Sequence, residues 1–109
     1  MIRISFRYDE SGCSTAFMCD GHAGFARSGR DVVCAAVSVL TINTVNSVES
    51  FTDDAFELET NEKRGYMKFS FKNEPSDEGR LLLKSLELGI KGIIEDNGNR
   101  FINLVEWEV

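Results

Sequence analysis

The chain has 109 residues, of which 42% are hydrophobic, and it contains a single proline, as is typical of one small globular domain rather than a disordered segment. Its net charge of −6 argues against direct binding to the nucleic-acid backbone, because phosphate groups would be repelled. No run approaches the roughly 20 apolar residues that span a bilayer, and no signal-peptide pattern is present, so we expect a cytoplasmic protein with one domain, residues 1–109.

Two strands are predicted at the start of the chain. Residues 1–8 alternate between apolar and polar side chains, as a half-buried strand does, and the polar residues 9–12 then form a turn. Residues 14–20 form the second strand, so this predicted hairpin leads directly into Gly21 and His22.

A helix is predicted next, from Asp31 to Val48 or Ser50. Asp31 is a preferred N-cap residue, and the segment that follows it is helical in pattern. Apolar residues cover so much of the circumference of this helix that we expect it to lie centrally in the fold.

The second half of the chain repeats the order of hairpin and helix. Residues 55–60 and 65–72 form a predicted hairpin around a polar turn, and a second helix is predicted to start at residues 75–78 and to stop at residues 97–98. Residues 101–109 are predicted to close the chain as a strand. The predicted order ββαββαβ is that of an α+β two-layer sandwich, in which two helices cover one face of a mostly antiparallel sheet.

The most informative segment joins the first hairpin to the first helix. It contains His22, the only histidine of the chain, and places Cys34 in the first turns of the helix, where unpaired N–H groups and the helix dipole favour a thiolate over a thiol. Gly21, Gly24 and Gly29 make the segment 21–31 a candidate lid over the thiol.

The same segment resembles the signature of the ribosomal-processing cysteine protease family (Prp) of certain bacteria. That signature is a Gly-His pair, a loop, and then Gly-x-Asp-hydrophobic-Val-Cys-Ala-Ala-hydrophobic-Ser. The pair corresponds here to Gly21 and His22, and residues 29–38 read GRDVVCAAVS. The resemblance extends over nearly the whole chain in the length and order of the predicted elements.

The resemblance implies an activity and a set of site residues. Cys34 and His22 would form the catalytic dyad, with Gly21, Asp31 and Ser38 as supporting residues. The substrate would be the N-terminal extension of the large-subunit ribosomal protein L-twenty-seven, cut after an aromatic pair. Neither a metal nor another cofactor is needed, and homodimers are implied by the family.

In this mechanism the thiolate attacks the peptide carbonyl, and the histidine donates a proton to the leaving amine. We expect N–H groups at the helix start, including that of Cys34, to stabilise the oxyanion. Asp31 either caps the helix or orients His22, and Ser38 lies one turn beyond Cys34 on the same helix face.

Three other interpretations of the cysteines were weighed. Cys34 could be a small core residue of a non-catalytic module that binds a ribosomal protein or an assembly factor. It could also be a redox-sensing thiol, for which Cys13 or Cys19 would have to be within reach. A zinc site is disfavoured because no C-x-x-C pair is present, and three cysteines without disulfide spacing indicate a reducing compartment.

Overall fold

The computed structural model describes residues 1–21, 30–96 and 100–107, with the side chains of Arg30 and Asp31 left out. The elements are β1 (Ile2–Tyr8), β2 (Ser14–Asp20), α1 (Arg30–Phe51), β3 (Phe56–Asn61), β4 (Tyr66–Phe71), α2 (Asp77–Glu95) and β5 (Ile102–Leu104). This order confirms the predicted ββαββαβ arrangement.

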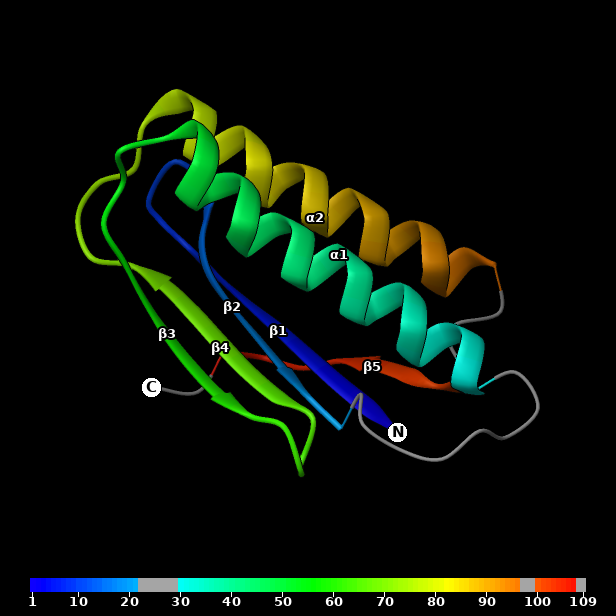
Figure 1. Cartoon of the computed structure of the whole chain (residues 1–109). Helices are drawn as coiled ribbons and strands as arrows, with labels where there is room; N and C mark the ends of the chain where they lie inside the picture. The colour runs from blue at the N-terminus through cyan, green and yellow to red at the C-terminus, as the bar shows by residue number, and fades with distance from the viewer. Residues whose placement is uncertain (22–29, 97–99, 108–109) are drawn as a thin grey trace.

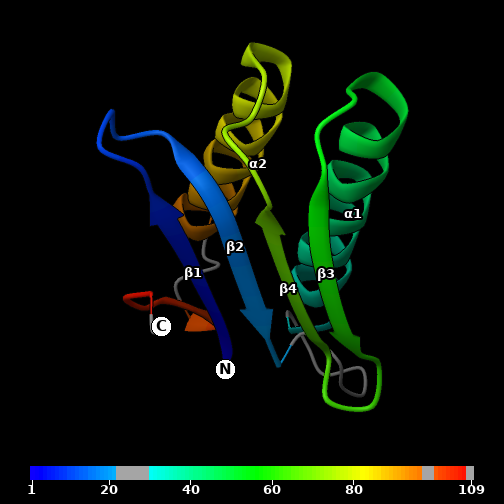
Figure 2. The ribbon, with the colours of Figure 1, turned by 90° about the vertical axis from the view of Figure 1, so that its left-hand side faces the viewer.

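The five strands form one sheet in the order β3-β4-β2-β1-β5. Pairing is antiparallel between β1 and β2, β2 and β4, and β3 and β4, and parallel between β1 and β5. Both helices lie on one face of the sheet and run in opposite directions, as Figures 1 and 2 show. The predicted two-layer sandwich with a mostly antiparallel sheet is therefore confirmed.

The helix-covered face of the sheet is apolar because the strands alternate. Ile2, Ile4 and Phe6 on β1 are buried, and so are Phe17 and Cys19 on β2. Side chains of successive residues in a strand point to opposite faces, so these residues share one face.

Aromatic rings extend this core across the sheet. The rings of Phe17 and Phe69 stack with their centroids 5.3 Å apart, and Phe56 and Phe71 contact Phe69 from either side at 5.0 Å. Stacked and edge-on ring pairs contribute roughly 0.5–1.5 kcal/mol beyond the burial of their area.

The two helices approach each other closely where α2 has a glycine. A Cβ atom at Gly89 would lie 2.9 Å from a methyl group of Leu40 on α1, closer than real carbon atoms pack. The predicted apolar stripe of α2 contributes Leu83, Leu86 and Ile90 to the core. The helices therefore cover the sheet as one layer.

Three predictions about α1 need correction. The helix begins at Arg30, so Asp31 lies inside its first turn and is not the N-cap. α1 is also not surrounded by the core, because Val32 and Val39 are 73% and 66% exposed. Finally, the expectation that no segment is long and apolar enough to span a bilayer is wrong. Val32–Phe51 has a mean hydropathy of 1.5 and is long and apolar enough to do so, although the core helices of soluble proteins also meet these two criteria.

The last strand is shorter than predicted. It comprises only Ile102–Leu104, whereas residues 101–109 were expected to be extended along the sheet. Continuing the register of Ile102 with Ile2 and of Leu104 with Ile4 would place Glu106 beside Phe6 on the apolar face. A carboxylate is unfavourable on the apolar face of a sheet, which is consistent with the departure of the chain from the sheet after Leu104.

Replacing Ser76 by alanine should lower the free energy of unfolding by about 1–2 kcal/mol, because Ser76 caps the start of α2. Its hydroxyl accepts a hydrogen bond from the Gly79 N–H (3.1 Å) and donates one to Asp54 (2.6 Å). Urea denaturation would measure the loss, with Ser50→Ala at an exposed position of α1 as the control. Equal stability of the Ser76→Ala protein and the wild type would contradict the capping role.

Candidate active site

Cys34 lies near the start of α1, on the side of the helix that faces the sheet. It is the fifth residue of the helix and only 7% exposed, within the same apolar cluster as Val37 and Cys19. A substrate carbonyl can reach Sγ only if this small exposed fraction increases on binding.

The neighbour of Cys34 on the sheet is Cys19, at the end of β2. Cys19 is fully buried, and burial raises the pKa of its thiol to about 12, with further contributions from the charges of Asp20 and Cys34. Cys19 pairs with Ile4 in the β1–β2 ladder. Cys34 is thus positioned over the start of β1 and the end of β2. The chain continues from this end of β2 into Gly21.

The chain leaves β2 through Gly21, whose backbone conformation requires glycine. Gly21 has a φ of +93°, and a Cβ atom there would lie 3.0 Å from the carbonyl oxygen of Met1. Its N–H donates a hydrogen bond to the carbonyl of Gly65 at 3.0 Å. This turn fixes the direction in which the chain leaves β2.

Asp20 anchors the end of β2 from the opposite face of the sheet. Its carboxylate accepts two hydrogen bonds from Arg64, at 2.9 and 3.0 Å, and lies 3.6 Å from Arg3. Through the hydrogen bond and its charge, Asp20 raises the pKa of the Arg64 guanidinium. Asp20 is not among the site residues predicted from the sequence. Its position directly before the Gly-His pair is the feature that could have indicated a role near the site.

The structure describes only some of the predicted site residues. Gly21, Cys34 and Ser38 are described, and half-buried Ser38 follows Cys34 by one helical turn. Asp31 is described only as a helical residue, so its predicted role toward His22 stays a prediction. His22 itself and most of the predicted lid, segment 21–31, lie outside the described residues.

The expectation for the oxyanion donors is wrong in one respect. In an α-helix that begins at Arg30, the N–H of Cys34 bonds to the Arg30 carbonyl, because each N–H pairs with the carbonyl four residues earlier. The unpaired N–H groups of such a helix belong to its first four residues. Donors for an oxyanion must therefore come from this first turn or from outside the helix, not from the Cys34 N–H.

The redox-sensor interpretation is disfavoured by the state of Cys19. A resolving cysteine attacks as a thiolate, and a pKa of about 12 leaves roughly one Cys19 in 10⁵ ionised at neutral pH. All three cysteines are free thiols. Within the described residues, no group of three His, Cys, Asp or Glu side chains could hold a metal ion.

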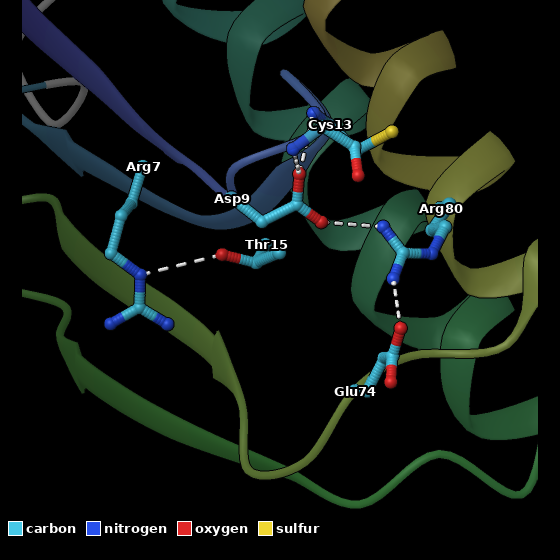
Figure 3. Close-up of polar contacts among 7 residues, drawn as sticks. Arg7, Asp9, Cys13, Thr15, Glu74 and Arg80 are labelled. Carbon is cyan, nitrogen blue, oxygen red and sulfur yellow. Dashed lines mark hydrogen bonds and ion pairs between the residues drawn. The ribbon is translucent and has the colours of Figure 1, made fainter.

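A separate polar cluster lies at the other end of the molecule, where the β1–β2 hairpin meets the start of α2 (Figure 3). Asp9 accepts hydrogen bonds from the N–H groups of Ser11 and Cys13 and from Arg80. The bond to Arg80 is the main cause of the lowered pKa of Asp9. Arg80 also pairs with Glu74 at 3.1 Å. The ion pair between Asp9 and Arg80 therefore joins the hairpin to α2, and the charges of the cluster largely compensate one another.

Comparisons with known proteins identify the family of this fold and site. The family model described as "Cysteine protease Prp" matches residues 1–102. The ribosomal processing cysteine protease Prp of Staphylococcus aureus (strain Mu50) is 25% identical over 88% of this chain and 91% of its own length. The Bacillus subtilis protein of the same name is 32% identical over 86% of this chain and 81% of its own.

Solved structures agree with this result. The S. aureus protease with a covalently linked product peptide aligns with a TM-score of 0.85 and 25% identity, covering 98% of this chain and all of that one. A Streptococcus mutans protein aligns with a TM-score of 0.85 and 33% identity, covering 97% of this chain and 96% of that one. The S. aureus protease with a substrate peptide has the same fold, with a TM-score of 0.88 at 24% identity and coverage of 98% and 100%.

Thiol alkylation should modify Cys13 much faster than Cys19, because burial raises the pKa of the Cys19 thiol to about 12 and leaves little of the reactive thiolate. Cys13 is half-buried, whereas Cys19 is fully buried, which widens the difference further. Timed N-ethylmaleimide labelling with peptide mapping would measure both rates, and labelling in urea would serve as the control. Labelling of Cys19 in the native protein as fast as Cys13 would contradict the register of β2.

Proposed function

Because the chain belongs to the family of Prp cysteine proteases, we propose that Cys34 and His22 form its catalytic dyad and that it removes the N-terminal extension of ribosomal protein L-twenty-seven. The protein is a cysteine protease of ribosomal processing, as its family and its relatives indicate. A non-catalytic binding module is therefore not its function. The dyad and the particular substrate are the parts proposed here.

The proposed reaction passes through a thioester. The Cys34 thiolate attacks the scissile carbonyl, and the C–N bond breaks as His22, in its protonated form, donates a proton to the leaving amine. Water then attacks the thioester with His22 as the general base, which releases the new carboxylate and restores the thiol. A metal or cofactor is not required for either step.

The observation that carries this proposal is the placement of Cys34. It lies at the end of α1 that carries the positive partial charge, over the end of β2 that leads through Gly21 into His22. A strand end and a helix start that are adjacent in the fold support a dyad of residues 12 positions apart. Ser38 and Asp31 lie on the same end of α1 and are proposed as supporting residues.

The proposed partner is a protein and not a nucleic acid. A net charge of −6 repels phosphate backbones but attracts a basic ribosomal protein. Two S. aureus neighbours were solved with a substrate peptide and with a covalently linked product peptide. A cytoplasmic location, away from any membrane, is consistent with a substrate that is assembled into ribosomes.

We further propose that the protein is a homodimer that associates through α1. Between Val32 and Val48 this helix carries no charged residue, although 28% of the whole chain is charged. Val32, Val39 and Ile42 lie on one side of the helix and are 73%, 66% and 48% exposed. An exposed apolar stripe on a strongly charged protein is typical of an interface with another protein.

Replacing Cys34 by alanine should abolish cleavage of the precursor without unfolding the protein, since alanine is small and favours helices. His22→Ala should lower the rate by about 10²- to 10⁴-fold, the usual contribution of general acid–base catalysis. Intact-mass analysis of the incubated precursor would measure both, with Cys13→Ala as an active control. Turnover by a folded Cys34→Ala protein would refute the assignment of the nucleophile.

Introducing a charge into the α1 stripe should dissociate the proposed dimer. Val39→Asp is expected to convert a species of twice 12.2 kDa into a monomer of 12.2 kDa, because a dimer would bury this carboxylate unpaired. Light scattering after size exclusion would measure the mass. Leu88→Asp, at a 73% exposed position of α2, is the matched control. A wild-type mass of 12.2 kDa at every concentration would rule out this interface.

A further inference from the structure

One edge of the sheet is left open beside a groove. β5 pairs with β1 only from Ile2 to Ile4, and the last bond of this pairing runs from the Val105 N–H to the Ile4 carbonyl. Among the described residues, no strand pairs with β1 beyond this point on that side. The open part of the edge is the remaining length of β1, Ser5–Tyr8.

The direction of the backbone groups along this edge follows from the pairs that are formed. Ile2 and Ile4 bond to β5, so the alternating residues Phe6 and Tyr8 present their N–H and C=O groups to the same side. Arg7 instead pairs with Ala16 of β2. Unpaired backbone groups in a row are the template on which an extended peptide adds as another strand.

The space beside this edge is large enough for such a strand. A groove of about 600 Å³ lies between α2 and residues 104–107, and its lining includes Phe6, Tyr8, Ile90 and Trp107. The groove exists because the chain leaves the sheet after Leu104, as described above. On the opposite edge, β3 carries exposed Glu57 and Glu59, a usual protection against strand addition.

We propose that the open edge of β1 binds one extended segment of the protein substrate, away from the bond that is cut. This inference rests on the proposed function. The net charge of −6 favours a basic segment. Within the groove, Glu87 is paired with Lys91 at 3.3 Å and Arg7 lies over the ring of Trp107, and exposed Glu106 has no ion-pair partner among the described residues. Proteins that bind ribosomal RNA carry basic residues to neutralise its phosphates.

The groove does not contain Cys34. Cys34 lies beside Cys19, which pairs with Ile4, and from Ile4 the open edge continues to Tyr8. At 3.3 Å per residue the edge extends about 13 Å away from this point. A peptide with three residues on each side of the scissile bond reaches at most roughly 10 Å from that bond, so it does not extend to Tyr8 at the far end of the edge.

Comparing two substrates tests the proposal. Cleavage of the full-length precursor is measured beside cleavage of a peptide with three residues on each side of the bond. Tyr8→Pro removes an N–H from the edge, and Tyr8→Phe is its control because both lose the hydrogen bond to Glu87. Glu106→Arg reverses the unpaired charge of the groove, and Glu59→Arg makes the same change on β3.

We expect Tyr8→Pro and Glu106→Arg to raise KM for the precursor by about five-fold, with kcat and the cleavage of the short peptide unchanged. The two controls should cleave both substrates as the wild type does. Hydrogen exchange should also show new protection of the Phe6 and Tyr8 amides when the precursor binds to Cys34→Ala protein.

Two results would overturn the inference, and they differ from each other. If Glu106→Arg cleaves the precursor with the KM of the wild type and the two amides gain no protection, the edge does not bind the substrate, while the proposed function stands. If the wild type does not cleave the precursor at all, the proposed function fails and the docking fails with it.

Discussion

The register between β1 and β2 is the constraint on which the site depends. It places Cys19 on the helix-covered face and its neighbour Asp20 on the other. A slip of one residue would exchange the two, burying a carboxylate in the core and exposing the thiol. The register therefore sets both the apolar surface against which Cys34 packs and the ionic anchor formed by Asp20 and Arg64.

This arrangement brings together two cysteines with different surroundings. Cys34 belongs to the apolar cluster and lies near the start of α1. Cys19 lies within the sheet, and burial raises the pKa of its thiol to about 12. The register of β2 therefore places a buried, uncharged thiol beside the proposed nucleophile.

The sequence predicted the element order well, because it depends on local patterns. Alternation identified β1 and β2 with little error, and the bounds of β2 are those predicted. The start of α1 was misplaced by one residue, since capping preference alone does not distinguish Asp31 as a cap from Asp31 within the first turn. The length of β5 could not be predicted because it depends on which residue of β1 would lie beside Glu106 in the sheet.

The geometry of the site was less predictable than its composition. Cys34 and Gly21 were identified from a motif, but the role of Gly21 rests on a positive φ and on the nearby carbonyl of Met1, which is distant in sequence. Asp20 was missed for a related reason. Its partner Arg3 lies on β1, and its partner Arg64 lies in the turn between β3 and β4. Contacts of this kind depend on the order of the strands, which no local pattern encodes.

The composition of α1 illustrates why an apolar helix is ambiguous in a sequence. One side, including Val37 and Val48, is buried against the sheet and α2, whereas Val39 on the other side is 66% exposed. A helix that buries one apolar face and exposes another lacks charges all round and therefore has the hydropathy of a membrane span. The sheet resolves this ambiguity in the structure, because the buried side of α1 packs on an apolar layer of strands.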